Sequence, residues 1–195
     1  MTFSTVITAW QKGTRLMEDL HHGDFVVEQL VMGLRSAYFP DVKGGNYRYG
    51  FQMEDGVDGS YGGDRISWVK LGRALVGDDW PFADTPHRVV FRVTEDDEGR
   101  PAASVRAWRL HGQPEEFDPD SLEPIILSRK VVGFDCRCAH RLVDGEIEWL
   151  DEWSQSNRVP TIVEVTLYLE AVEEGGEPQA LRRAMGLPAA AMSWQ

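Results

Sequence analysis

The sequence predicts an α+β fold in which one long N-terminal α-helix packs on antiparallel β-sheet. Residues 2–39 repeat apolar side chains with a period near 3.6, as amphipathic helices do. Residues 64–172 instead alternate apolar and polar side chains, as half-buried strands do. The sequence shows no strand–helix–strand repeat, which disfavours a parallel sheet and the enzymes built on crossover loops.

The N-terminal segment carries its apolar groups at heptad spacing. The two sets of positions are Trp10, Met17, Val31 and Tyr38, and Val6, Leu20, Val27 and Leu34. A helix over residues 2–39 would be roughly 50 Å long at about 1.5 Å per residue, so its first turns should extend beyond the sheet. We therefore expect the stripe residues Val6, Trp10, Met17 and Leu20 to contact partner proteins. Packing of these side chains onto their own chain is the alternative.

Three residues weaken this helix and one ends it. Gly13 and Gly23 each cost about 1 kcal/mol relative to alanine in a helix interior. Asp24 occupies a position where the stripe requires an apolar group, so we expect fraying or a bend there. Pro40 disfavours a helical conformation at the preceding residue, which predicts a helix end near residue 39.

Composition indicates one domain over residues 1–195. The chain has 42% apolar residues and no long linker. Its 32 acidic and 20 basic side chains leave a net charge of -12, which would repel a nucleic-acid backbone. No apolar run approaches the roughly 18 residues that span a bilayer, and no secretory signal is evident.

After the helix the sequence predicts a variable Gly/Asp loop, a β region and a tail. The loop covers residues 40–63, the antiparallel β region covers 64–172, and the tail, a short helix or disordered, covers 173–195. The expected strands lie within 64–71, 87–94, 104–110, 125–143 and 161–172, with a return strand through Ile147 and Trp149. Asp144-Gly145 predicts a tight hairpin turn.

Acidic residues of the loop are weak candidates for calcium ligands. Asp55, Asp58 and Asp64 could supply oxygen ligands. They lack the spaced pattern of a calcium-binding EF-hand loop, so a solvated surface loop is the favoured interpretation and no metal site is assigned. No cofactor is expected.

Other chemistry-bearing patterns have simpler structural interpretations. Glu18, His21 and His22 have a spacing found in di-metal helical bundles, but such sites need further ligands on facing helices. Trp149 and Trp153 could stack on a sugar, although core and edge packing is more usual.

The two cysteines and the scattered polar residues give no catalytic set. Cys136 and Cys138 share a strand face, where a disulfide would be strained, so two packed thiols are expected, although the sequence leaves their redox state open. No nucleophile–base or paired-carboxylate arrangement can be assembled, and we do not predict an enzyme.

The order of these segments resembles a known family. A long helix is followed by strands, then Ile147-Glu-Trp149-Leu-Asp-Glu-Trp153, Val159-Pro160, and the alternating strand Val163-Glu-Val165-Thr-Leu167. This closing pattern resembles that of the J-type minor pseudopilins of the bacterial type II secretion system, and the match extends to about residue 170. The Gly/Asp loop is longer than in the family, and the Ala-rich tail has no counterpart there.

The resemblance implies a pilin-like fold and a structural role without catalytic residues. J-type proteins join the I- and K-type minor pseudopilins in a tip complex that helps to start pseudopilus assembly for protein export. Family members are prepilins, with a processed leader and an apolar anchor in the inner membrane and a globular domain in the periplasm. We expect such an anchor to have preceded Met1.

Two alternatives remain open at the level of sequence. The first is a minor pilin of a type IV pilus, which shares the helix and the middle strands. The second is a periplasmic β domain that binds calcium or a carbohydrate through the loop and the tryptophans. Neither the exported substrates nor the stoichiometry and order of tip assembly can be read from the sequence.

Overall fold

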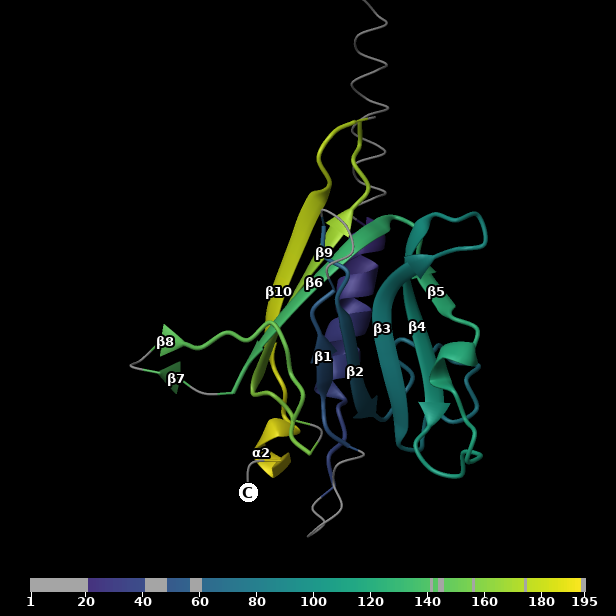
Figure 1. Cartoon of the computed structure of the whole chain (residues 1–195), viewed down its shortest axis with the longest axis vertical. Coiled ribbons are helices and arrows are strands. Elements are labelled where there is room, and N and C mark those ends of the chain that lie inside the picture. Colours follow the sequence, from purple (N-terminus) through teal and green to yellow (C-terminus); the bar gives the residue numbers. More distant parts are fainter. Residues whose placement is uncertain are drawn as a thin grey trace, which may run out of the picture.

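Antiparallel strands are the main secondary structure of the chain, with 40% of the residues in β-structure. The computed structural model describes residues 21–40, 49–56, 61–140, 142–143, 146–155, 157–173 and 175–193. Structural statements below concern these residues. The strands form a five-stranded sheet, a three-stranded sheet and a two-stranded ribbon (Figure 1).

The five-stranded sheet follows the chain order β1-β2-β3-β4-β5. Its strands are β1 (Gln52–Glu54), β2 (Arg65–Lys70), β3 (His87–Glu95), β4 (Pro101–Arg109) and β5 (Ile125–Ser128). Each pairs antiparallel with the next, and a register shift between Ala103 and Ser104 interrupts the β4–β5 pairing. A short 3-10 helix, η2 (Pro119–Ser121), lies in the connection before β5.

The three-stranded sheet has the order β10-β9-β6. It contains β6 (Val131–Ala139), β9 (Ile162–Leu169) and β10 (Gln179–Gly186). The ribbon of β7 (Leu142–Val143) and β8 (Glu146–Ile147) extends to one side, and a short helix α2 (Ala190–Ser193) ends the described chain (Figure 1).

The two larger sheets share one hydrophobic core. The rings of Phe91 in β3 and Phe134 in β6 meet edge to face with centroids 4.7 Å apart. Gly63 forms a parallel bridge with Phe134, and Met53 pairs with Trp153, so backbone hydrogen bonds also join the layers. Val89, Phe91, Val163, Val165 and Leu167 are completely buried between them.

The described part of the N-terminal helix covers residues 21–35 and contacts both sheets. Its buried side chains are Val26, Val27, Leu30 and Leu34. At Gly23 a Cβ would lie 2.6 Å from Leu181 of β10, and at Gly33 a Cβ would lie 3.2 Å from Trp68 of β2. The indole Nε1 of Trp68 also donates a hydrogen bond to the Gly33 carbonyl, 2.9 Å away. These glycines therefore allow close approach of the helix to each sheet.

The predicted fold class is wrong. The expected α+β, pilin-like fold has a long N-terminal helix packed on sheet, whereas the described residues are mostly β, with two larger antiparallel sheets and an N-terminal helix of 15 residues. The described helix ends at residue 35, and Ser36 forms a turn. The helix cannot continue because Ala37 forms an antiparallel bridge with Lys70. It also continues without a break through Gly23 and Asp24, where fraying or a bend was expected.

Most of the strand predictions are confirmed. The strands expected within 64–71, 87–94, 104–110 and 161–172 correspond to β2, β3, β4 and β9. Val143 pairs antiparallel with Glu146, which confirms a hairpin, while the expected turn residues Asp144 and Gly145 lie outside the described residues. The sequence missed β1, which lies in the expected loop 40–63, and β10, which lies in the expected tail 173–195.

Candidate functional site

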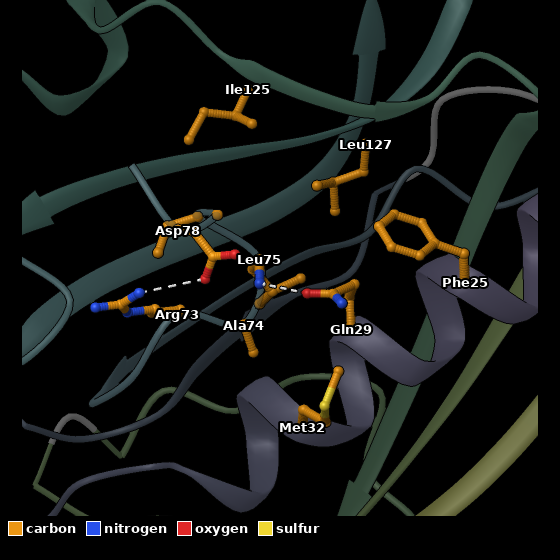
Figure 2. A pocket seen from close by; sticks show the side chains of 11 residues that line it. Phe25, Gln29, Met32, Arg73, Ala74, Leu75, Asp78, Ile125 and Leu127 are labelled. Carbon is orange, nitrogen blue, oxygen red and sulfur yellow. Dashed lines mark hydrogen bonds and ion pairs between the residues drawn. The ribbon is translucent and has the colours of Figure 1, made fainter. Parts of the chain in front are cut away.

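The best candidate site is an apolar groove between the helix, the segment 73–78 and the edge strand β5. It has a volume of about 430 Å³. Figure 2 shows helix side chains on one side of it and β5 side chains on the other. Its lining residues are Phe25, Gln29, Met32, Arg73, Ala74, Leu75, Val76, Gly77, Asp78, Ile125 and Leu127.

One face of the helix forms the first wall. Phe25, Gln29 and Met32 are spaced by four and three residues, so they project from the same side. Phe25 is 45% exposed and Met32 is 48% exposed, although both are large apolar side chains. The helix therefore has two apolar faces, one in the core and one toward the groove.

The edge of the five-stranded sheet forms the opposite wall. Ile125 and Leu127 alternate along β5 and so lie on one face of it, where each is half-buried. β5 pairs only with β4 within the described residues. An edge strand beside an apolar helix face is a surface on which another chain can pack.

Leu75 forms the floor in a strained backbone conformation. Its φ angle is 72°, in the left-handed region, which costs a non-glycine residue about 1–3 kcal/mol. Its amide donates a hydrogen bond to Oε1 of Gln29, 2.8 Å away, and its side chain is buried. The amides of Val76 and Gly77 both donate to the carbonyl of Arg73, which closes the turn. The groove is thus shaped by a fixed turn.

The charged groups lie at the rim. Arg73 Nη1 and Asp78 Oδ1 are 3.4 Å apart, and both side chains are more than half exposed. Such a pair contributes little to stability. The interior of the groove is apolar, so it is suited to packing apolar side chains and offers no arrangement for proton transfer or covalent catalysis.

The structure leaves the predicted partner-binding residues untested. Val6, Trp10, Met17 and Leu20 lie outside the described residues. The sequence reasoning missed Phe25 and Met32, which are seven residues apart and so share a helix face. Their seven-residue spacing forms a second apolar face, separate from the heptad stripe, and this spacing could have identified Phe25 and Met32 from the sequence.

Of the calcium candidates Asp55, Asp58 and Asp64, the structure describes Asp55 and Asp64. Both carboxylate oxygens of Asp64 accept backbone hydrogen bonds, Oδ1 from Gly56 at 3.1 Å and Oδ2 from Cys136 at 2.6 Å. Burial raises the pKa of Asp64 to about 6 despite these bonds. Asp58 lies outside the described residues, and no cluster of three or more potential metal ligands occurs among those described. Calcium binding stays an untested prediction.

The tryptophan pair does not form a sugar-stacking platform. Trp153 is only 2% exposed and lies in the shared core. Trp149 is half-buried beneath the guanidinium of Arg137, whose Cζ lies 4.5 Å from the indole centroid. His21 and His22 are exposed on the helix, and Glu18 is outside the described residues.

Cys136 and Cys138 are buried and carry free thiols, a redox state that the sequence left open. Burial raises the pKa of both, so neither is an activated nucleophile.

Comparisons with family models, curated proteins and solved structures find no match to this chain. None of the described helices is long and apolar enough to cross a membrane. The function is therefore inferred from the residues and their geometry.

Proposed function

We propose that the chain is a structural minor pseudopilin of the bacterial type II secretion system, acting in the pseudopilus tip complex. The observation that carries this proposal is the closing sequence pattern, with Trp149 and Trp153, then Val159-Pro160, then Val163-Glu-Val165-Thr-Leu167. The long N-terminal helix expected for the family gives no support, because the structure contradicts that fold. The groove beside the helix supports the assembly role.

The closing pattern has a structural function inside the domain. Trp153 exchanges two backbone hydrogen bonds with Met53 of β1, each 3.0 Å long. Val163, Val165 and Leu167 are completely buried on one face of β9. These residues hold the two sheets together, so they are poor candidates for partner contacts, and the partner surface must lie elsewhere.

The groove is the surface proposed for subunit contact. Phe25 and Met32 expose nearly half of their surfaces, next to the half-buried Ile125 and Leu127. Burial of a large apolar side chain contributes about 1.5–3 kcal/mol. A neighbouring subunit that inserts apolar side chains here would gain free energy from all four residues at once.

The proposed partners are the I- and K-type minor pseudopilins, and the proposed location is the periplasmic face of the inner membrane. The role is structural, because apolar packing in the groove requires no reacting group. Export across the outer membrane would depend on the chain through assembly of the tip.

Co-purification with the I- and K-type proteins encoded in the same genome tests this proposal. We expect a stable complex, and we expect the double variant Phe25→Ser/Met32→Ser to bind at least about tenfold more weakly, as the loss of two apolar contacts implies. Met192→Ser is the matched control, because Met192 is 38% exposed on α2, outside the groove.

Two results would overturn the proposal. One is the absence of any complex between the wild-type chain and either partner. The other is equal binding by the wild-type chain and the groove variant. Type II secretion would be favoured by a neighbouring I- or K-type reading frame and by loss of exported proteins from the medium when the gene is deleted. Loss of pili on deletion would favour the type IV pilus alternative.

A further inference from the structure

The strand β10 forms an open edge of the three-stranded sheet (Figure 1). It pairs with β9 at all eight positions without a register shift, and no strand pairs with its other side within the described residues. The opposite edge of this sheet is partly occupied, because β6 forms bridges to Gly63 and Leu150. The edge strands of the five-stranded sheet, β1 and β5, have only three and four residues. In the described part of the chain, β10 is therefore the longest open edge.

Two printed hydrogen bonds show which backbone groups of β10 are free. The amide of Leu187, directly after β10, donates to the carbonyl of Thr161, 3.0 Å away. The amide of Glu170, directly after β9, donates to the carbonyl of Lys130 beside β6, 2.8 Å away. The odd-numbered residues of β9 and β10 therefore bond to each other, because such pairs recur at every second residue of an antiparallel ladder. The even-numbered residues of β10 direct their N–H and C=O groups outwards: Ala180, Arg182, Ala184 and Gly186.

The outward-directed residues leave room for another strand. All four are exposed, and three of them are alanine or glycine, so few side-chain atoms cover the free backbone groups. Proline and bulges are common devices that block the pairing of an edge strand, and β10 contains neither. The free backbone groups of β10 are thus suited to strand addition, in which an extended segment of another chain continues the sheet.

The charge of β10 restricts the partner. Arg182 and Arg183 are adjacent and both exposed, so their side chains lie on opposite faces of the sheet. Arg182 Nε is 3.7 Å from Oε1 of Glu164, an oxygen that also accepts from Arg137 Nε at 2.7 Å. Arg183 has no ion pair with any other described residue. The edge therefore has surplus positive charge in a chain whose net charge is -12.

A second copy of the chain is a poor partner for this edge. Antiparallel pairing of β10 with itself must match the outward-directed residues of the two copies. The two registers with the longest overlap pair Arg182 with its own counterpart, or pair Arg182 with Ala184. The second of these registers places the two Arg183 side chains opposite each other. Like charges directly opposite destabilise a sheet, so both registers are disfavoured, whereas an acidic strand meets no such repulsion.

We propose that β10 binds an extended acidic segment of a partner protein, which adds to the three-stranded sheet as a further strand. Backbone hydrogen bonds to the outward-directed residues would hold the segment. Two adjacent acidic side chains, one on each face, would pair with Arg182 and Arg183. The strand shares no residue with the groove beside the helix, so this inference is independent of the proposed pseudopilin role.

Two synthetic eight-residue peptides test the proposal. Both consist of threonine and valine except for the two central residues, which are glutamates in one peptide and lysines in the other. We expect the glutamate peptide to give a saturable NMR response below about 1 mM and to slow hydrogen exchange of the Arg182 and Ala184 amides. The Leu181 and Arg183 amides already bond to β9 and should change little. The lysine peptide should bind at least about tenfold more weakly.

Two variants separate the contributions of charge and backbone. We expect Arg182→Gln/Arg183→Gln to bind the glutamate peptide at least about fivefold more weakly, as loss of two cross-strand charge pairs implies. Arg100→Gln/Arg109→Gln is the matched control, because it removes the same charge from exposed positions outside the three-stranded sheet and should leave binding unchanged. Ala184→Pro removes an outward N–H without removing a bond to β9, so it should retain the fold and lose the peptide.

Four outcomes would overturn the proposal. The first is the absence of saturable binding of the glutamate peptide to the wild-type chain. The second is equal binding of the two peptides, or equal binding by the wild-type chain and the arginine double variant. The third is unchanged peptide binding by folded Ala184→Pro. The fourth is concentration-dependent protection of the same amides without peptide, which would identify a second copy as the occupant. The two peptides decide the case on the wild-type chain even if a variant does not fold.

Discussion

Nζ of Lys70 lies 3.3 Å from Nε2 of His87, and neither side chain is exposed to solvent. Nδ1 of His87 is 2.8 Å from the Thr85 carbonyl, so Nδ1 carries the proton and Nε2 accepts from the lysine. Lys70 also donates to the Gly72 carbonyl. Burial lowers the pKa of Lys70 to about 8 and that of His87 to about 4.

The buried lysine should make stability rise with pH in the alkaline range. The pKa of Lys70 is about 8 in the folded state and 10.5 in the unfolded state, so between these values the unfolded state binds the extra proton. The free energy of unfolding should therefore increase from about pH 8 to 10.5, by on the order of 3 kcal/mol. Urea denaturation at a series of pH values measures this increase in the free energy of unfolding.

Lys70→Met is the control for this prediction. The variant keeps an unbranched side chain of similar length but has no titratable group, so the difference between the two curves isolates Lys70. Parallel curves for the wild-type chain and Lys70→Met between pH 8 and 10.5 would contradict the prediction.

Asp64 should have the opposite effect in the acidic range. Its pKa is raised from 3.8 to about 6, so between these values the folded state holds the extra proton. Its contribution to the free energy of unfolding should fall by on the order of 3 kcal/mol as the pH rises from about 4 to 6. Because His87 titrates in the same window with the opposite sign, we compare wild-type with Asp64→Asn. A pH-independent difference between them would refute the assignment.

Gly33→Ala should destabilise the protein even though alanine favours helix. The new Cβ would lie 2.6 Å from Cδ1 of Leu75, and the overpacking cost of about 1–3 kcal/mol exceeds the helix-propensity gain of about 1 kcal/mol. We expect a net loss of about 1 kcal/mol by urea denaturation. Glu28→Ala, at an exposed position of the same helix, is the control and should stay within a few tenths of a kcal/mol of wild-type. A gain of stability in Gly33→Ala would show that the contact is loose.

Gln29 should stabilise the strained turn at Leu75. Gln29→Ala removes the acceptor of the Leu75 amide and should cost about 1–2 kcal/mol. Hydrogen exchange of the Leu75 amide, measured by NMR, should become faster. Gln29→Glu retains an acceptor oxygen and should preserve slow exchange; unchanged exchange in Gln29→Ala would argue against the bond.

Local patterns predicted much of the β-structure, but long-range pairing decided the rest. The alternation in 64–71 and 161–172 specified β2 and β9, because each buries one face. Residues Gln179–Gly186 include Ala180, Leu181 and Arg182, all good helix formers, yet they form β10 by pairing with β9 along all eight positions. Propensity alone could not have identified that strand.

The end of the helix and the groove also depend on contacts between residues far apart in the sequence. The apolar periodicity that predicts a helix over residues 2–39 extends past Ala37, which pairs with Lys70 instead. These two residues are thirty-three positions apart, so no local pattern encodes their contact. Gly23 has a low helix propensity, yet its missing side chain permits contact with Leu169 and Leu181. Phe25 and Met32 are candidate contacts because β5 lies opposite them across the groove.

The hydrogen bond from the Cys136 amide to Asp64 joins groups 72 residues apart. Closing so long a segment costs chain entropy before any contact across it is gained, so the two layers should come together late in folding. On the ribosome, β1 to β5 would emerge with their core face uncovered until β6 and β9 follow. A chaperone that shields this face during synthesis should therefore raise the yield of native protein.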